Sequence, residues 1–304
     1  MIEVSHLTRR YGDVTAVDDV SFVIGRGEVV GLLGHNGAGK TTIMKMMTGF
    51  LEPGGGTIRF DGLEIGRDTS AIQARLGYLP ENCPVWPDMT VVDYLDYQAA
   101  LHGVSKERRP RAIAHAIRRT ALSEKATRPI HTLSRGYRQR VGVAQAILHE
   151  PDIIILDEPT NGLDPTQIRH MRELVRELAS KATVIVSTHI LQEVQAVCER
   201  VLILRAGRLI IDSRLEDLQL SHALLVTVEG DARATLESVE GVAEVAELAA
   251  DETRRQYRLE APPTVAPLVA SALAHAGLGL HELRVERQDL ETVFARVNEE
   301  PVHA

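Results

Sequence analysis

The stretch that decides the fold of this chain is Gly34-His35-Asn36-Gly37-Ala38-Gly39-Lys40-Thr41. It follows a strand-like run, 28–33, and it opens a helical segment, 41–48, that Gly49 closes. Glycines let the backbone turn tightly, so the amide N–H groups and the helix N-terminus can meet negative charge. The pattern therefore predicts a loop that binds the phosphates of a nucleoside triphosphate.

Two side chains of this loop have expected roles of their own. Lys40 can reach the β- and γ-phosphates, and the Thr41 hydroxyl can ligate Mg²⁺. A dinucleotide-binding loop needs the order G-x-G-x-x-G, which is missing here, and a chance glycine turn does not explain the whole pattern in its context. The residues expected to bind the nucleotide are Gly34, His35, Asn36, Gly37, Ala38, Gly39, Lys40, Thr41 and Thr42.

A second apolar run, 153–156, ends in two carboxylates, Asp157 and Glu158. A strand of this kind is buried in a sheet and delivers the acids at its end. We expect Asp157 to hold Mg²⁺, directly or through water, and Glu158 to polarise the attacking water. In isolation, a buried strand followed by a solvated acidic turn explains these residues equally well. The phosphate loop favours the catalytic interpretation.

The first two-thirds of the 304 residues alternates strand-like runs, such as 152–156 and 183–187, with helical segments. This order predicts an α/β fold with a largely parallel sheet. Asp164 and Pro165 predict a helix start, and the helix is expected to run to about residue 180. Residues 88–149 are predicted to form a helical subdomain. The basic run 106–111 inside it is interpreted as a solvated helix end rather than a binding patch.

The composition changes after residue 212, where motifs give way to alanine, valine and glutamate. Segments between 222 and 297 follow the order β-α-β-β-α-β-α, with the last helix over 290–297. This order predicts a small α+β module of the ferredoxin-like kind with a trailing helix. The sequence therefore predicts a nucleotide-binding domain over 1–220 and an accessory domain over 221–304.

The composition limits the possible partners and the compartment. The formal net charge is −8, with 42 acidic and 34 basic residues, so nucleic acid is disfavoured as a partner. The two cysteines, Cys83 and Cys198, lie far apart in sequence and are typical of a reducing compartment. No stretch approaches the roughly 18 apolar residues that a bilayer span needs. In a membrane process, another chain would have to supply the pore.

Further motifs appear in a fixed order, and together they resemble the nucleotide-binding subunits of ABC transporters over roughly residues 2–215. The segments that carry the resemblance are a Q-loop at Gly77–Glu81, a signature at Leu133–Arg140, a D-loop at Asn161–Pro165 and an H-loop at Ser187–His189. Tyr11 stands where this family places an aromatic residue that stacks on adenine.

The resemblance implies an ATPase that uses ATP and Mg²⁺ and works as a homodimer or as a dimer with a related cassette. In such a dimer two head-to-tail cassettes enclose two ATP molecules, because the signature of one subunit contacts the nucleotide of the other. Ser134 and Gly136 would make that contact, and Asp164 of the D-loop belongs to the same interface. His189 would contact the γ-phosphate and position either the water or Glu158.

Several positions depart from the family pattern. Arg135 and Tyr137 replace a glycine and a glutamine of the signature, and His35 replaces a common proline. Glu81 stands where a glutamine is usual. Its carboxylate can still bind Mg²⁺ or water, so it is counted among the candidate metal and catalytic residues. It cannot donate a hydrogen bond, however, and an ordinary surface role stays open.

The segments 80–82 and 134–139 resemble the ABC-2 exporter branch, and within it the ATPases of gliding-motility and copper-enzyme maturation systems. This resemblance implies export through a separate membrane permease and a cytoplasmic location at the inner face of the membrane. Trp86, close to the Q-loop, is expected either to anchor the permease or to pack locally.

The alternative hypothesis is a soluble ABC ATPase that acts on ribosomes or DNA. Translation-type relatives usually carry two cassettes in one chain, and DNA-repair relatives carry long coiled coils between the phosphate loop and the signature. This chain has one cassette, and its helical insert is short and lacks heptads. A P-loop kinase would leave the signature and the Ser-Thr-His segment unexplained.

Overall fold

The computed structural model describes residues 1–251, 253–287, 290–291 and 294. The chain forms two compact units, Met1–Leu215 and Glu216–Ala304. In the described part of the chain, no helix has the length and apolar character needed to cross a membrane.

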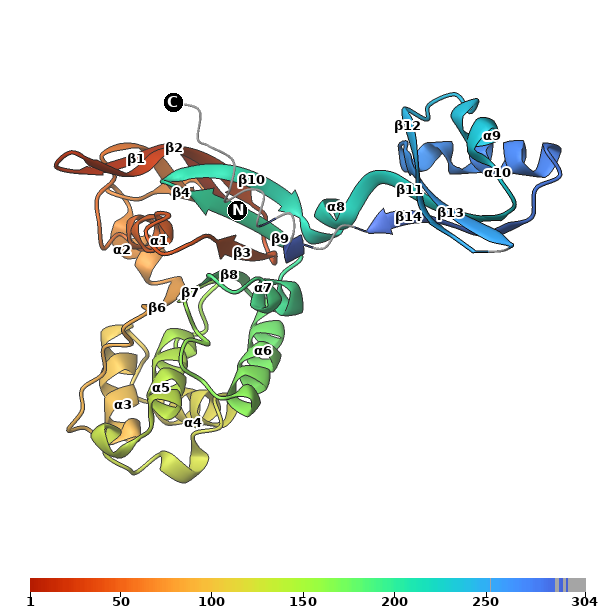
Figure 1. The fold of residues 1–304 in the computed structure, drawn as a ribbon. Coiled ribbons are helices and arrows are strands. Elements are labelled where there is room, and N and C mark those ends of the chain that lie inside the picture. The colour runs from red at the N-terminus through yellow and green to blue at the C-terminus, as the bar shows by residue number, and fades with distance from the viewer. Residues whose placement is uncertain (252, 288–289, 292–293, 295–304) are drawn as a thin grey trace. The chain divides into compact units, whose positions relative to one another are not determined.

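A six-stranded sheet forms the centre of the first unit, in the order β10-β9-β3-β8-β7-β6 (Figure 1). Its five strands from β9 to β6 are parallel, and β10 pairs antiparallel with β9. Every residue of β3 and β7 is buried, which explains why these strands are continuous apolar runs. The strands are β3 (Val29–Leu33), β6 (Leu76–Leu79), β7 (Ile153–Asp157), β8 (Thr183–Thr188), β9 (Arg200–Arg205) and β10 (Arg208–Arg214).

The predicted strands at 28–33, 152–156 and 183–187 are confirmed within about one residue. The predicted α/β class is also confirmed, but the sheet is not the only one in the unit. An antiparallel sheet in the order β2-β1-β4-β5 accompanies it. Its strands are β1 (Ile2–Tyr11), β2 (Val14–Ile24), β4 (Gly55–Phe60) and β5 (Leu63–Glu64).

The helix that follows the phosphate loop, α1 (Lys40–Met47), packs between the two sheets. Its buried side chains Ile43 and Met44 share one hydrophobic cluster with Leu7 of the antiparallel sheet and Ile155 of the parallel sheet. Burial of these side chains fixes the phosphate loop to the carboxyl edge of the parallel sheet.

A group of helices lies on the other side of the unit from the antiparallel sheet (Figure 1). It falls within the predicted helical segment 88–149 and consists of α3 (Val91–Leu101), α4 (Arg109–Arg119), η1 (Ser123–Lys125), η2 (Ile130–Thr132) and α5 (Arg135–Ile147). The remaining helices of the unit are α2 (Thr69–Gln73), α6 (Pro165–Ala179) and α7 (Leu191–Val197). The helix predicted from Asp164 and Pro165 is confirmed as α6, and Asp164 caps it in a capping box with Gln167.

The second unit contains a four-stranded antiparallel sheet in the order β12-β13-β11-β14. Its core contains Leu224, Tyr257, Val269 and Leu273. The elements are α8 (Leu215–Gln219), β11 (Leu220–Glu229), α9 (Arg233–Glu237), β12 (Glu244–Ala250), β13 (Arg254–Glu260), η3 (Pro263–Val265), α10 (Ala266–His275) and β14 (Leu280–Arg287).

From β11 to β14 the order is β-α-β-β-α-β, the order predicted from the sequence and found in ferredoxin-like modules. Most of the predicted trailing helix at 290–297 lies outside the described residues.

Candidate functional site

The phosphate loop runs from the end of β3 to the start of α1. Gly39 caps the helix with a φ of +104°, and a Cβ atom at this position would lie 2.6 Å from the Ala16 carbonyl oxygen. Only glycine fits this left-handed, crowded position. The adjacent Lys40 is buried, and its ammonium donates to the carbonyl oxygens of Gly34 at 2.6 Å and His35 at 3.3 Å. The loop thus curls around its own lysine.

Asp157 ends strand β7 and is fully buried. Its Oδ1 accepts a hydrogen bond from the Ser187 hydroxyl, and its buried Oδ2 has no hydrogen-bond partner among the described residues. A buried carboxylate oxygen without a partner is costly, so it marks a place where a cation or a donor belongs. Burial lowers the pKa of Lys40, whereas the nearby Glu158 and Asp157 raise it.

The donor set at this edge fits Mg²⁺. In the described part of the chain, no group of three or more histidine, cysteine or acidic side chains could hold a metal ion by itself. Mg²⁺ is commonly held by only one or two protein oxygens, with phosphate and water as the other ligands. The unpartnered Asp157 oxygen and the half-buried Thr41 hydroxyl match that requirement.

Glu158 is buried and pairs with the exposed His189. Both carboxylate oxygens of Glu158 lie 3.0 Å from His189 Nδ1, and one lies 3.8 Å from the Lys40 ammonium. Burial raises the pKa of Glu158, and His189 and Lys40 counteract part of that rise. A carboxylate with a raised pKa that lies beside a cation is typical of a catalytic base.

The backbone of Glu158 is held in an unusual conformation, with a φ of +50°. Its amide donates to both the carbonyl oxygen and the hydroxyl of Ser187, at 3.2 and 3.1 Å. Strand pairing places Asp157 opposite Ser187, so β8 fixes the end of β7 directly. The surrounding structure therefore compensates for the strained glutamate backbone.

Glu81 follows β6, which pairs with β7 through Leu79 and Leu156. Its charge raises the pKa of Lys40, so it lies close to the phosphate loop. The Glu81 side chain is exposed and forms no hydrogen bond among the described residues. Glu81 therefore follows β6 at the edge of the sheet where Asp157 ends β7, and its role toward Mg²⁺ stays a prediction.

Comparison with known proteins identifies the family. The family model described as ABC transporter matches residues 17–161. The ATP-binding protein NatA of Bacillus subtilis is 38% identical over 72% of this chain and 91% of its own length. The Nod factor export ATP-binding protein I of Ralstonia nicotianae is 34% identical over 98% and 93%. This chain belongs to the ABC transporter ATP-binding proteins.

Two further similarities agree with that assignment. The linearmycin resistance ATP-binding protein LnrL of Bacillus subtilis is 30% identical over 97% of both chains, so its length also covers the second unit. Among solved structures, an ATP-binding subunit of an ABC transporter is 32% identical and has a TM-score of 0.67 over 72% of this chain and 91% of its own.

The signature of this ABC protein begins helix α5. Ser134 caps the helix by accepting the Tyr137 amide at 3.4 Å. A Cβ atom on Gly136 would lie 2.2 Å from Oε1 of Gln167, and Gln167 in turn donates its amide to Asp164 at 2.9 Å. Gly136 therefore packs against the start of α6, and the Asp164 carboxylate serves as a helix cap.

The substituted signature position Arg135 contacts the D-loop. A Cβ atom on Gly162, which has a φ of +74°, would lie 2.8 Å from the Arg135 guanidinium carbon. Tyr137, the second departure, has the cationic groups of Lys125 and Arg140 over its ring at 5.5 and 5.3 Å. Both substitutions are thus accommodated by local contacts.

Among the described residues, no hydrogen bond or ion pair joins Ser134 or Asp164 to Lys40 or Glu158. Tyr11 likewise stands apart at the end of β1, with 48% of the residue exposed and the Arg9 guanidinium 5.1 Å from its ring. The structure thus brings Lys40, Asp157, Glu158 and His189 together, and it leaves the signature and Tyr11 as separate surfaces.

Sequence reasoning missed Glu193, a buried carboxylate in helix α7. Its Oε2 accepts hydrogen bonds from the hydroxyls of Thr160 and, at 3.0 Å, of Thr188. Thr160 lies two residues after Glu158, and Thr188 directly precedes His189. The available signal was an acid one helical turn after His189, close to the apolar residues Leu191 and Val194.

Proposed function

We propose that this chain is the ATP-binding and ATP-hydrolysing subunit of an ABC exporter, and that it powers a separate membrane permease. The observation that carries the proposal is the convergence of Lys40, Asp157, Glu158 and His189 at one edge of the parallel sheet. Ligands of parallel α/β sheets bind at this carboxyl edge.

Each residue of the site has a distinct task in the proposed reaction. Lys40 and the loop amides would hold the β- and γ-phosphates, and Asp157 and Thr41 would hold Mg²⁺. The bound metal would supply positive charge that offsets the charge of the phosphates. Glu158 accepts a proton from the attacking water, and burial, which raises its pKa, makes it a better base near neutral pH.

His189 acts next to Glu158. Its Nδ1 donates to the carboxylate at 3.0 Å, which orients the base. The ring is partly exposed, which leaves it open to a ligand at this edge. His189 is therefore proposed to position the glutamate and to contact the γ-phosphate.

The proposal includes a dimer of head-to-tail cassettes. Ser134 caps its own helix and Gly136 packs against Gln167 of α6, and among the described residues neither forms a hydrogen bond with Lys40. A single chain therefore leaves the phosphate loop without the second group of donors that the family uses. A second copy, or a related cassette, would supply them and complete each ATP site.

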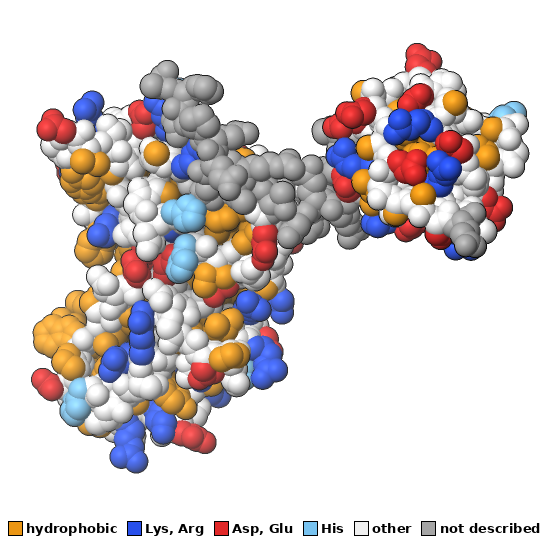
Figure 2. All heavy atoms as spheres, in the orientation of Figure 1, with side chains coloured by type: hydrophobic (Ala, Val, Ile, Leu, Met, Phe, Trp, Pro, Cys, Tyr) orange, Lys and Arg blue, Asp and Glu red, His pale blue; other side chains and the backbone are white. Residues whose placement is uncertain are grey.

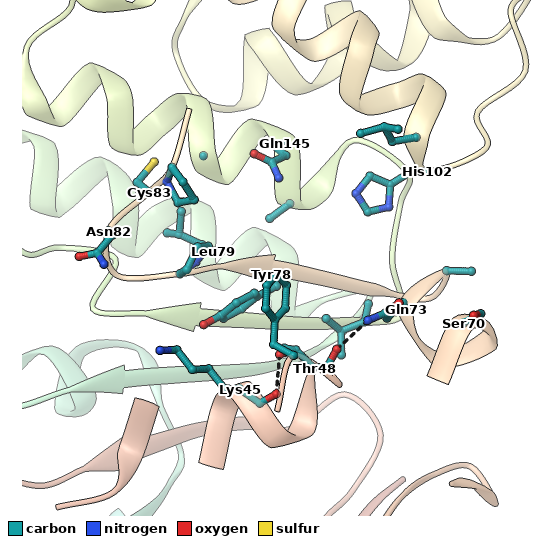
Figure 3. A pocket seen from close by; sticks show the side chains of 18 of the residues that line it. Lys45, Thr48, Ser70, Gln73, Tyr78, Leu79, Asn82, Cys83, His102 and Gln145 are labelled. Carbon is teal, nitrogen blue, oxygen red and sulfur yellow. Dashed lines mark hydrogen bonds between the residues drawn. The ribbon is translucent and has the colours of Figure 1, made fainter. Parts of the chain in front are cut away.

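A groove beside the Q-loop is the proposed contact with the permease. It has a volume of about 760 Å³ and lies between the α1–α2–β6 side, with Thr48, Gln73 and Tyr78, and the helical side, with Cys83 and Gln145 (Figure 3). This size suits an inserted protein segment. A groove between these two sides allows an occupant to contact both of them at once.

Two glycines make one wall of the groove rigid. A Cβ atom on Gly77 would lie 2.0 Å from the Ala146 carbonyl oxygen, and one on Gly142 would lie 2.4 Å from Cys83 Sγ. Strand β6 and signature helix α5 therefore approach closely. A displacement of the groove walls by a bound permease segment is expected to move the signature helix α5. This movement would couple the permease to closure of the dimer.

Trp86, expected either to anchor the permease or to pack locally, lies beside Tyr97 of helix α3. It is 60% exposed and its ring lies 5.9 Å from that of Tyr97, but it is not among the residues of the described chain that line the groove. The Trp86–Tyr97 pair is proposed as a second, flanking contact. Export as the direction is supported by the relatives named for Nod factor export and linearmycin resistance.

The Glu158→Gln variant tests the catalytic assignment, with the exposed Glu150→Gln as a charge-matched control. ATP hydrolysis should fall by a factor of about 10² to 10⁴, the usual contribution of a general base, while ATP binding is retained. The variant should also accumulate as an ATP-dependent dimer in size-exclusion chromatography. Near-normal turnover of Glu158→Gln would refute the role of this residue as the base.

Co-purification from membranes tests the transport assignment. A membrane protein should be recovered with the tagged chain, and a peripheral location at the cytoplasmic membrane follows from that partner. The competing hypothesis of a soluble ABC ATPase predicts ribosomes or DNA instead. On the face drawn in Figure 2, acidic and basic side chains of the described residues are interspersed, which does not favour a polyanion track.

A further inference from the structure

A second cavity lies beside the Q-loop groove and has an opposite chemical character. It has a volume of about 800 Å³ and shares Ala74, His102 and Gly103 with the groove. Cavities of this size accept small organic ligands. We call it the basic pocket, because its lining contains Arg108, Arg111, Arg118 and Lys181, the histidines His102, His115 and His149, and a single acid, Glu150.

The three arginines of the basic pocket come from one helical face. Arg108 caps α4, and Arg111 and Arg118 follow at spacings of three and seven residues, which places them on the same side. Lys181 joins them from the segment after α6. The fold therefore gathers four permanent positive charges around one cavity in a chain whose net charge is −8.

The charges of the basic pocket lack partners. Among the described residues, the side chains of its three arginines and of Lys181 form no ion pair and no hydrogen bond. Two other arginines of the same helix are paired, Arg109 with Asp96 at 3.9 Å and Arg119 with Glu177 at 2.8 Å. The arginines of α4 outside the pocket are thus paired with acidic side chains, whereas the cations that line the pocket are not.

The acid of the basic pocket does not neutralise the arginines. Glu150 lies 4.0 Å from His115 Nδ1, so its charge is directed at the histidine. Like charges that share a cavity repel one another, and a bound anion relieves that repulsion. The unpaired charges therefore indicate an anionic ligand.

We propose that the basic pocket binds a phosphate-bearing anion. A phosphate group carries about two negative charges and three acceptor oxygens, so one or two such groups offset four cations. The planar guanidinium of arginine matches phosphate in two parallel hydrogen bonds. A carboxylate carries only one charge and would leave most of the lining uncompensated. Two residues of the run 106–111, which the sequence predicts to be a solvated helix end, line this pocket, and their side chains are exposed.

The phosphate can come from a soluble compound or from the headgroup of an anionic phospholipid. Binding of inorganic pyrophosphate, measured by calorimetry with a non-hydrolysable ATP analogue saturating the phosphate loop, tests the first source. Flotation with phosphatidylcholine vesicles, with and without 30% phosphatidic acid (about a third of the lipid, enough for a strong negative surface potential), tests the second, because the headgroup of phosphatidic acid is a phosphate monoester. The proteins compared are wild type and two double variants of the full chain.

The Arg111→Gln/Arg118→Gln variant removes two charges from the basic pocket. The control, Lys106→Gln/Arg128→Gln, removes two exposed charges of the same helical region that do not line it. We expect saturable binding in at least one of the two assays, a loss of at least tenfold in the pocket variant, and wild-type behaviour in the control. The assay that responds identifies the source of the phosphate.

Two results would overturn the proposal. One is the absence of binding in both assays, which would leave an acidic protein segment as the remaining partner. The other is an equal loss in the pocket and control variants, which would show attraction to overall charge only. ATPase activity should be the same in all three proteins, so failure here is distinguishable from failure of the proposed catalytic function.

Discussion

The buried carboxylate of Glu193 is predicted to position the catalytic pair, although its side chain bonds neither Glu158 nor His189 among the described residues. Its Oε2 accepts two hydroxyl hydrogen bonds, from Thr160 and Thr188. The Thr188 hydroxyl also accepts the Ile190 amide at 3.1 Å. One carboxylate therefore holds the chain segment after Glu158 and the segment that carries His189.

The magnitude follows from these bonds. A hydrogen bond to a charged group contributes about 1.5–3 kcal/mol, so Glu193→Ala should lower the free energy of unfolding by about 3–5 kcal/mol. Glu193→Gln keeps the volume and one carbonyl acceptor and should cost about 1–2 kcal/mol. Misplacement of a catalytic group by about 1 Å can cost about 10²-fold, so we expect kcat to fall by about tenfold to a hundredfold.

The assay is steady-state ATP hydrolysis by the full chain, with unfolding followed in parallel. Because Lys40 and the phosphate loop are untouched, KM for ATP should stay within about twofold while kcat falls, the signature of lost transition-state stabilisation. The exposed Glu173→Ala in α6 serves as the control and should behave like wild type. A folded Glu193→Gln protein with unchanged kcat, or with a loss confined to KM, would refute the positioning role.

Three further predictions concern the site and the two units. The acidic limb of the kcat–pH profile should have its midpoint above 4.5, because burial raises the pKa of Glu158 and protonation removes the base; His189→Ala should move that midpoint further up, since His189 lowers this pKa. If His189→Ala leaves this midpoint unchanged, the pairing of His189 with Glu158 is contradicted. Asp157→Asn should leave ATP binding intact and raise the Mg²⁺ concentration for half-maximal activity at least about tenfold, since a ligand charge is lost; an unchanged Mg²⁺ titration would count against Asp157. Removal of residues 221–304 should change ATP affinity by less than about twofold, because the phosphate loop, Asp157, Glu158 and His189 all belong to the first unit; a folded truncated chain that cannot bind ATP would disprove the independence of the first unit.

Much of the central sheet could be predicted because its strands are buried on both faces. The run 153–156 contains only isoleucine and leucine, and a continuous apolar run of that length has few other structures open to it. The antiparallel sheet was not predicted. Strand β1 pairs with irregular register between Val4 and Arg10, and its residues 8–11 are polar or exposed, so the alternation typical of a strand is lost.

In the candidate site, too, the residues of short motifs could be predicted, whereas contacts between residues far apart in the chain could not. Lys40, Asp157 and Glu158 stand in motifs whose chemistry is local to a few residues. The link from Thr160 to Glu193 spans 33 residues and exists only because α7 packs near the end of β7. The packing of Gly136 on Gln167 depends in the same way on two helices that the sequence places far apart. Motifs therefore predict the reacting groups, and tertiary contacts decide how those groups are held.

These contacts also suggest which half of the ATP site moves. Glu158 and His189 are joined to each other and to Ser187, and strand pairing between β7 and β8 makes them one rigid edge with Asp157. A strained backbone such as that of Glu158, with its φ of +50°, persists only where its surroundings hold it firmly, so this edge is poorly suited to large displacement. The signature helix α5 belongs instead to the helical group, and it packs closely on the walls of the Q-loop groove. Motion that begins at the groove should therefore move the signature of one cassette toward the ATP site of its partner. The glutamate base of that site is already in place and does not have to be assembled around ATP.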